Sequence, residues 1–600
     1  MAREQFAAVE MILNMIQGKT DGVSRVDFHP QKGEYPKGVK YEQPFLRASP
    51  ESQGISSARL SGLIRDLTGD KKIDLHHLMV LRHGKMICEC HVAPYRGEIW
   101  HIAHSMCKSI TGMAIGLLID EGKLSLDENI YKIFEERMKP RRKRFRPAVT
   151  VENLLTMTSG VQFNESGIVS GNDWLGGFLN ASVREKPGTV FQYNSMNSYV
   201  LSAIVTERTG LTLTEYLRPR LFIPLGIKNF LWETCPSGIT KGGWGLFLCP
   251  EDMAKLGQLY LKKGKWNGVS LIPETWVTES TRKHVESSEG TYGYGYQIWR
   301  ENRPDSFEFN GMLGQNVIVY PDIDMVLVTC AGSNKLFQDC SLLDIVRRHF
   351  PVDYRPEDYS QDKKMKEDVS GQYFLSRQIR RAGARESEGA DIRIRRGGWP
   401  KKSGNCTKNN RKRLDISGFL KKIDGRCYLM DPQSTGLFPL LLQVMQNNLT
   451  QGIRKAAFRR ESGEFWFMVL EGESWHQIKV GFKQAEETWL KIHEESFLIS
   501  TKGELAFDED HTPVLKLDIA FLEEAVRREI KILFIDDRIE MRCFETPGKD
   551  LILEGLSSVM DEMKNSLMFG RFKGKKGDEL IRILLERTIE PVAKGVRDFD

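Results

Sequence analysis

Ser105 and Lys108 are a serine and a lysine three positions apart, at the start of an apolar stretch that ends at Gly122. Residues i and i+3 share one face of an α-helix, so we expect the lysine amine close to the serine hydroxyl. The free amide groups and the positive end of that helix would lie at the same place. The arrangement supplies a nucleophile, a base and a site that favours negative charge, which is the chemistry of acyl transfer through serine. Such a pair also occurs by chance, so other parts of the chain must agree with it.

Three neighbours of this pair could also do chemistry. His101 and His104 could bind a metal ion, but the sequence places no third ligand beside them. We therefore expect both to pack or to line a pocket, and we predict no metal and no cofactor. Cys107 should lie off the helical face shared by Ser105 and Lys108, so we expect it to pack as well.

The elements that must position these residues predict an α+β domain over residues 45–352. Helices are expected at 55–67, 105–122 and 150–160, and again from 195 and from 250. Strands are expected within 77–91, with a turn at His83-Gly84, and within 307–329, with a turn at Pro321. Helices in the middle and strands at both ends indicate an antiparallel sheet that pairs early with late segments, beside a helical cluster.

The remaining segments flank this domain. Residues 1–44 predict a helix over 5–17 and then a polar connector that packs on the main domain. Residues 353–413 are rich in lysine and arginine and predict a basic linker or exposed strand, the start of an accessory domain. Residues 414–600 predict a β-rich accessory domain with two helices, roughly 551–568 and 577–590, close to its end.

Length and composition exclude several classes of protein. A chain of 600 residues exceeds one hydrophobic core, so two or more domains are expected. A net charge of +6 is too small and too dispersed to indicate nucleic-acid binding. No apolar run reaches the ~18–20 residues that cross a bilayer, so no membrane association is expected. The first residues do not resemble a secretion signal and the ten cysteines are scattered, which together predict a cytoplasmic protein with free thiols.

Residues from about 45 to 350 resemble the serine β-lactamase and penicillin-recognising family, in the branch of class C-like esterases, DD-peptidases and 6-aminohexanoate-dimer hydrolases. Ordered motifs carry this resemblance: Ser105-Met-Cys-Lys108, residues 114–127, 154–160, 187–193 and 250–257, and Gly314-Gln315. The resemblance implies that Ser105 forms an acyl-enzyme, that Lys108 acts as its base and that Tyr193 assists proton transfer. A lysine acts as a base only when neutral, a form that burial or a cationic neighbour favours. Packing in the core is the alternative for Tyr193.

The second family motif departs from the β-lactamase pattern. It is Tyr193-Asn194-Ser195 here, where β-lactamases have Tyr-x-Asn. A serine in third place is similar to the dimer-hydrolase and esterase branch. Ser195 would offer a shorter side chain to Lys108 and to a substrate amide, and Asn194 or Asn197 could substitute for the missing carboxamide.

The third family motif departs as well, because Phe309-Asn310-Gly311 stands where the family has Lys-Thr-Gly or His-x-Gly. The cation that would bind a substrate carboxylate is missing. Gly311 remains, the amide of Met312 could join that of Ser105 in an oxyanion hole, and Gln315 could line the pocket.

These features predict a serine hydrolase that acts through an acyl-enzyme on an ester or small amide, related to β-lactamases but without β-lactamase or DD-carboxypeptidase activity. Its partner would be a small-molecule substrate. A catalytically idle penicillin-recognising fold that serves as a binding or regulatory module through its terminal half is the alternative. Residues from about 360 resemble a β-rich module that follows such hydrolases in some bacterial proteins.

Overall fold

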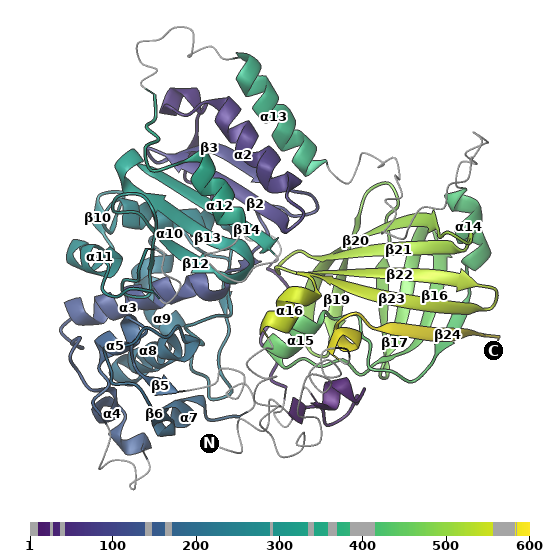
Figure 1. Ribbon diagram of the computed structural model, residues 1–600, viewed down its shortest axis with the longest axis horizontal. Coiled ribbons are helices and arrows are strands. Elements are labelled where there is room, and N and C mark those ends of the chain that lie inside the picture. The colour runs from purple at the N-terminus through teal and green to yellow at the C-terminus, as the bar shows by residue number, and fades with distance from the viewer. Residues whose placement is uncertain are drawn as a thin grey trace.

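The computed structural model describes residues 10–11, 13–24, 28–36, 42–138, 147–162, 171–287, 292–333, 341–357, 369–384, 415–555, 583 and 585–599. Within these residues the chain forms two large bodies that lie side by side in Figure 1. One is a sheet covered by helices, and the other is a strongly curved sheet built from the last third of the chain.

The first body is organised on a sheet of seven described strands in the order β1-β3-β2-β14-β13-β12-β11. All of its pairs are antiparallel except β1 with β3. Its strands are β1 Leu46–Arg47, β2 Ile73–Arg82, β3 Lys85–His91, β11 Trp299–Arg300, β12 Phe307–Gly311, β13 Gln315–Tyr320 and β14 Met325–Ser333. The central pair joins β2 to β14, so the prediction that early strands pair with late ones is confirmed.

Both predicted turns of this sheet are present. His83 and Gly84 have φ values of 51° and 69° between β2 and β3, the left-handed conformation that two-residue hairpin turns require. The Pro321–Ile323 turn ends at Asp324, which has φ 49° and leads into β14.

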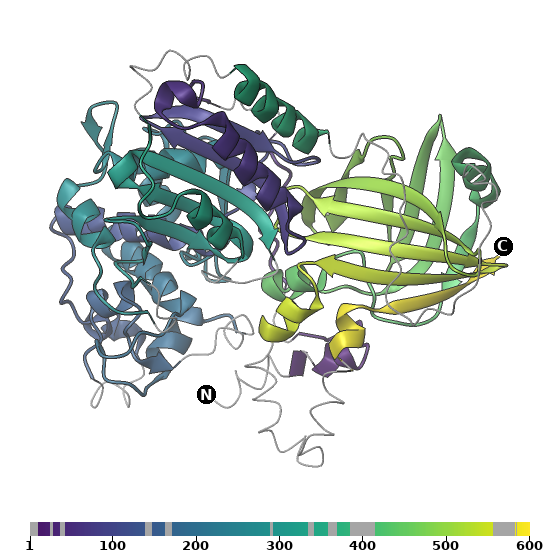
Figure 2. The ribbon, with the colours of Figure 1, turned by 45° about the horizontal axis from the view of Figure 1, so that its top comes forward.

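Helices cover both faces of the sheet (Figures 1 and 2). On one face α10 packs on β2, β13 and β14; on the other α2 packs on β2, and α12 and α13 pack on α2. Alternate strand residues supply the two cores, with Val326 and Val328 on one face and Met325 and Leu327 on the other. The helices of this body are α2 Ser57–Gly69, α3 Cys107–Asp120, α4 Ile130–Ile133, α5 Val151–Leu155, α7 Trp174–Asn180, α8 Ser195–Thr209, α9 Leu213–Leu217, α10 Pro250–Leu261, α11 Glu274–Thr281, α12 Ser341–His349 and α13 Val369–Gly383.

Smaller pieces complete this body. A three-stranded sheet joins β4 (His101–Ile102), β8 (Leu246–Leu248) and β7 (Phe230–Trp232). Two strand pairs, β5 Val161–Gln162 with β6 Ser182–Val183 and β9 Lys265–Trp266 with β10 Val269–Ser270, lie among the helices.

The second body is a sheet of ten described strands in the order β18-β17-β16-β15-β24-β23-β22-β21-β20-β19. Its two end strands, β18 and β19, contact each other, so the sheet curls into a nearly closed barrel (Figure 2). Its interior is filled by apolar side chains such as Phe458, Phe467 and Ile532. The strands are β15 Cys427–Met430, β16 Ile453–Glu461, β17 Glu464–Glu471, β18 Ser474–Lys479, β19 Glu486–Ile492, β20 Glu495–Phe507, β21 Pro513–Phe521, β22 Arg527–Ile535, β23 Arg538–Thr546 and β24 Val592–Asp598; the helices are α14 Ile416–Ile423, α15 Leu440–Gln446 and α16 Lys549–Gly555.

Three segments differ from expectation or extend it. Residues 369–383 of the predicted linker form α13, because Leu375, Ile379 and Ala382 give it an apolar side that packs with α2 and β3. Strand β24 was not predicted. It pairs with β15 and β23, which are distant in sequence or separated from it by other segments, and alternate residues of the strand are exposed. Much of the predicted helices at 5–17, 551–568 and 577–590 lies outside the described residues, which include helical residues 10–11, 13–16, 549–555, 583 and 585–589.

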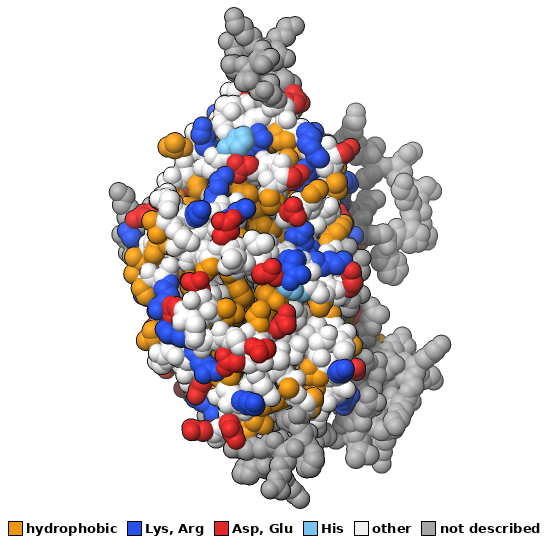
Figure 3. All heavy atoms as spheres, turned by 90° about the vertical axis from the view of Figure 1, so that its left-hand side faces the viewer, with side chains coloured by type: hydrophobic (Ala, Val, Ile, Leu, Met, Phe, Trp, Pro, Cys, Tyr) orange, Lys and Arg blue, Asp and Glu red, His pale blue; other side chains and the backbone are white. Residues whose placement is uncertain are grey.

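The surface carries charges of both signs. On the face shown in Figure 3, lysine and arginine side chains alternate with aspartate and glutamate side chains, and no single sign dominates the described part. Among the described helices, none combines the length and the apolar character needed to cross a bilayer.

Candidate active site

Ser105 lies in a short 3-10 turn, η2 (His104–Met106), which leads directly into α3. Every residue of α3 from Cys107 to Leu118 is buried, so the helix is fixed in the core on all sides. The Ser105 side chain is half-buried, whereas Lys108 is 1% exposed. The helix therefore holds Lys108 inside the domain, directly behind the more accessible serine.

Lys108 makes two close contacts with its nitrogen. Nζ donates to Ser105 Oγ at 2.8 Å and to the carbonyl oxygen of Gly243 at 2.7 Å. The predicted juxtaposition of amine and hydroxyl is therefore present. A buried amine next to a serine hydroxyl is the geometry in which a proton can pass between the two groups.

Residues 242–243 pass close to α3 and α8, and this close approach requires glycine at both positions. A Cβ on Gly242 would lie 2.8 Å from the carbonyl oxygen of Ser198, and a Cβ on Gly243 would lie 2.7 Å from that of Ser195. The carbonyl oxygen of Gly242 also accepts a hydrogen bond from Thr111 Oγ1 at 2.6 Å. Sequence reasoning missed this segment, although three glycines within residues 242–245 are a signal of close backbone approach.

Tyr193 lies beside Lys108. Lys108 Nζ is 5.0 Å from the centre of the tyrosine ring, within the range of a cation–π contact. The Tyr193 ring also stacks on Trp299, with centroids 5.5 Å apart, and Tyr294 meets it edge-on at 6.4 Å. These aromatic contacts fix the ring of Tyr193 in its place next to the Lys108 amine.

The residues after Tyr193 begin α8. Asn194 is its N-cap and accepts the amide hydrogen of Met196 at 2.8 Å, and Ser195 is its first residue. Asn197 Oδ1 accepts a hydrogen bond from Ser159 Oγ at 2.8 Å. Both carboxamides thus have structural partners, and the second anchor of the Lys108 amine is the backbone carbonyl of Gly243.

The third motif ends strand β12. Phe309 is fully buried and meets Tyr260 edge-on at 5.2 Å, so this position contributes to the core and carries no cation. A Cβ on Gly311 would lie 2.4 Å from the carbonyl oxygen of Ala103, which shows how closely the end of β12 approaches the segment before Ser105. Met312 follows in the turn η6 (Met312–Gly314), and η2 contacts β12, β13 and η6.

Gln315 is fully buried, and its polar atoms bind backbone groups. Nε2 donates to the carbonyl oxygens of Met312 at 3.1 Å and Ala331 at 2.7 Å, and Oε1 accepts from the amide of Ala331 at 3.2 Å. The side chain therefore ties the turn at Met312 to strand β14.

His101, His104 and Cys107 are all buried. Burial, aided by the charge of Lys108, lowers the pKa of His104 to about 3, so its imidazole is neutral. His101 Nε2 lies 2.8 Å from His76 Nδ1. Burial raises the pKa of Cys107 to about 12, which makes its thiol a poor nucleophile. Within the described residues, no group of three or more His, Cys, Asp or Glu is arranged to hold a metal ion.

The model of the Beta-lactamase family matches residues 60–343 of this chain. These residues form a β-lactamase family domain. The match includes η2, Tyr193 and strand β12, and it ends before the barrel.

Several known proteins are similar to parts of this chain. The 6-aminohexanoate-dimer hydrolase of Paenarthrobacter ureafaciens is 25% identical over 280 residues, which cover 42% of this chain and 70% of that protein. Protein flp of Staphylococcus aureus (strain MW2) is 29% identical over 132 residues, 21% of this chain and only 26% of its own length. The solved structure of a family VIII carboxylesterase covers 52% of this chain and all of its own, with 15% identity and a TM-score of 0.42. The solved structure of a penicillin binding protein from Bacillus halodurans covers 48% of this chain and 98% of its own, with 20% identity and a TM-score of 0.38.

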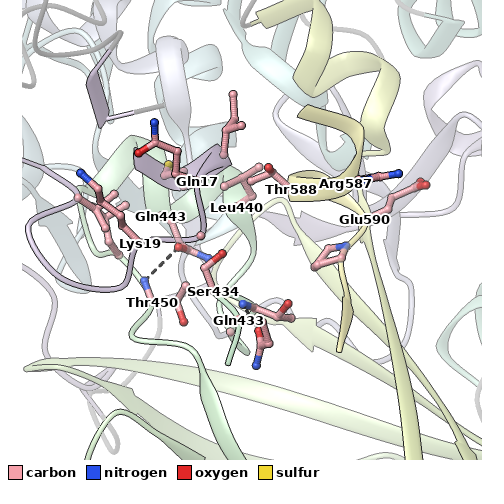
Figure 4. Close-up of a pocket in the computed structure, with 18 of the residues that line it drawn as sticks. Gln17, Lys19, Gln433, Ser434, Leu440, Gln443, Thr450, Arg587, Thr588 and Glu590 are labelled. Carbon is pink, nitrogen blue, oxygen red and sulfur yellow. Dashed lines mark hydrogen bonds between the residues drawn. The ribbon is translucent and has the colours of Figure 1, made fainter. Parts of the chain in front are cut away.

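The β-lactamase family domain does not contain the cavity shown in Figure 4. This cavity, of about 510 Å³, lies at one end of the barrel, where residues 15–19 meet α15 and residues 587–592. Its wall includes Gln443, whose Oε1 accepts the amide hydrogen of Thr450 at 3.0 Å. None of the candidate site residues lines it.

Proposed function

We propose that the chain is a serine hydrolase that cleaves an ester or small amide through an acyl-enzyme. The contact of 2.8 Å between Lys108 Nζ and Ser105 Oγ carries this proposal, since it joins a nucleophile to a buried base. The family match and the dimer-hydrolase relative support hydrolase chemistry for the domain that contains the pair.

The mechanism follows from the positions of the groups. Ser105 Oγ attacks the substrate carbonyl carbon while the Lys108 amine takes the hydroxyl proton. The oxyanion that forms is stabilised by the backbone amides of Ser105 and Met312. The close approach of Gly311 to the segment before Ser105 supports this pairing of the two amides. Tyr193 passes a proton to the leaving alcohol or amine, which leaves an acyl group on Ser105. The proton on Lys108 passes to Tyr193 and restores its hydroxyl. Water then attacks the acyl carbon while Lys108 takes one proton from the water; this proton passes to Ser105 Oγ, and the carboxylic acid is released.

The choice of substrate rests on the third motif. With Phe309 packed in the core, the position that would offer a cation to a substrate carboxylate offers none. Penicillins and peptidoglycan stem peptides carry such a carboxylate, so we infer an ester or an amide without this requirement. The name of the relative from Paenarthrobacter ureafaciens supports a small amide as a substrate class.

The test is an activity screen on the full chain with p-nitrophenyl esters of graded chain length and with nitrocefin. We expect ester turnover and fluorophosphonate labelling in the wild type, neither in Ser105→Ala, and no nitrocefin hydrolysis. Ser270→Ala, at an exposed serine, is the control and should behave as the wild type. Labelling or turnover that survives in Ser105→Ala contradicts the proposal, and complete inactivity of the wild type across the panel favours the binding module.

We also propose a cytoplasmic location. It is supported by the eight cysteines among the described residues, all of which are free thiols. Fractionation of cells that express the chain tests this: recovery with cytoplasmic markers is expected, and recovery with the envelope contradicts it.

A further inference from the structure

The turn between β21 and β22 of the barrel lies against the segment that leads to the nucleophile. In this turn Glu523 is 1% exposed. Its carbonyl oxygen accepts the amide hydrogen of Ile102 at 2.8 Å, and its Oε1 accepts from Trp100 Nε1 at 2.5 Å. Trp100 and Ile102 stand within five residues of Ser105, so one barrel residue binds the chain directly before the active-site turn by its backbone and by its side chain.

Glu523 is itself fixed on its other side. Its Oε2 accepts from the amide of Leu498 at 2.9 Å and from Lys32 Nζ at 2.7 Å. The Lys32 ammonium is completely buried and lies 4.2 Å from the ring centre of Phe497 and 5.3 Å from that of Phe247. A buried carboxylate with a buried counter-ion and two further hydrogen bonds has little freedom to move.

The same turn also supports the second segment of the proposed oxyanion hole. Leu522 and Ala525 share an apolar cluster with Ile102 and with Leu313 of η6, and Met312 packs against this cluster. A Cβ on Gly332 of β14 would lie 3.0 Å from the carbonyl oxygen of Ala525, so the turn sits directly on the sheet. The barrel thus contacts both chain segments whose amides would bind the oxyanion.

We infer that Glu523 of the barrel is a positioning residue for Ser105, and that the barrel forms the rear support of the active site. The inference deepens the proposed function and rests on it. Acyl transfer is sensitive to the placement of nucleophile and oxyanion donors, where an error of about 1 Å can cost about 100-fold in rate. Because Glu523 would act on the placement of the reacting groups, we expect its effect in kcat, with KM unchanged.

The test is Glu523→Gln in the full chain. The substitution keeps the size of the side chain but removes its charge and places an amide NH₂ against one of the donors that now bind the carboxylate. We expect kcat for the best p-nitrophenyl ester to fall at least about tenfold with KM within about twofold. Hydrogen exchange of the amides in residues 99–106 should be faster than in the wild type. Glu529→Gln, at a half-buried barrel carboxylate paired with Lys516, is the matched control and should change neither quantity.

The outcomes separate this inference from the proposed function. Exchange in residues 99–106 equal to the wild type overturns the inference, and so does faster exchange with unchanged kcat. If Ser105→Ala leaves turnover intact, the proposed function fails, and the exchange measurement alone decides whether Glu523 fixes the segment. Should Glu523→Gln not fold, Trp100→Phe removes the hydrogen bond to Oε1, retains the ion pair with Lys32, and is judged by the same two measurements.

Discussion

Lys108 Nζ lies 2.7 Å from the carbonyl oxygen of Gly243, a residue 135 positions later in the chain. The same nitrogen also donates to Ser105 Oγ, which lies 2.8 Å away. A backbone carbonyl thus anchors Lys108 in a chain whose second family motif has Ser195, and not asparagine, in third place. The anchor depends on close packing of glycines, so it can be tested by adding a single carbon atom.

Gly243→Ala should reduce activity. The new Cβ would lie 2.7 Å from the carbonyl oxygen of Ser195, so the segment must shift and move its own carbonyl away from Lys108. We expect at least about a tenfold loss of kcat from the misplaced base. Steady-state kinetics measure the loss, with Gly69→Ala in α2, where a Cβ has open space, as the control. Wild-type kcat in Gly243→Ala would show that the carbonyl is not needed.

Tyr193→Phe tests proton transfer by the tyrosine. The phenylalanine ring keeps the stacking on Trp299 and the contact with Lys108 Nζ, so stability should be retained. Loss of the hydroxyl should lower kcat by about 100-fold or more. Tyr373→Phe, at a tyrosine that is 56% exposed, should have no effect. A kcat within a few-fold of the wild type would place Tyr193 in a packing role.

Cys107→Ala separates the two nucleophile candidates of the motif. The thiol is fully buried, its Sγ lies 3.6 Å from the carbonyl oxygen of Gly242, and burial raises its pKa to about 12. We therefore expect the variant to be less stable yet fully labelled by a fluorophosphonate, with the label on Ser105 in peptide mass spectrometry. Lost labelling in a folded Cys107→Ala protein would contradict this assignment.

Lys32→Met tests the buried ion pair at the junction of the two bodies. The variant leaves Glu523 as an uncompensated buried charge, and breaking a buried pair in this way costs about 3–5 kcal/mol of unfolding free energy. Urea denaturation measures the loss. Lys228→Met breaks a half-exposed pair with Glu42 and should cost at most about 1 kcal/mol. Equal losses of unfolding free energy in the two variants would show that the buried pair stabilises the fold no more than the half-exposed pair does.

The buried side chain of Glu524, at the same junction, should make the free energy of unfolding depend on pH. Burial raises its pKa to about 8, against 4.5 for an ordinary glutamate, and Lys32 at 3.9 Å opposes the shift. Between these values the folded chain holds a proton that the unfolded chain has released, so the stabilisation is complete below about pH 4.5 and is lost as the pH rises to about 8.

Glu524→Gln should remove this contribution. From pH 6 to pH 9 the variant should gain roughly 2–3 kcal/mol of unfolding free energy relative to the wild type, because the wild type alone must deprotonate a buried acid. Urea denaturation at both pH values measures the difference, with the exposed Glu473→Gln as control. A constant difference between variant and wild type over this range would refute the prediction.

Local patterns in the sequence predicted much of the first body. The turn at His83-Gly84 and helices that begin at about residues 150 and 250 were expected, and all are present. Thr150 and Asn153 form a capping box at the first of these helices, and Pro250 is the first residue of α10. Each depends on residues that are close in sequence, where backbone preferences and capping act directly. The juxtaposition of Ser105 and Lys108 belongs to this group, since one turn of helix is enough to create it.

The sequence by itself therefore determined the helix that brings the hydroxyl and the amine together and the sheet that pairs early with late strands. Only the tertiary structure decided how that site is held: the Gly243 carbonyl on Lys108, the aromatic contacts behind Tyr193, and Glu523 of the barrel on the segment before Ser105. These contacts join residues that are about 100 to more than 400 positions apart. Their existence depends on which surfaces pack together, and no local pattern of spacing or polarity records that.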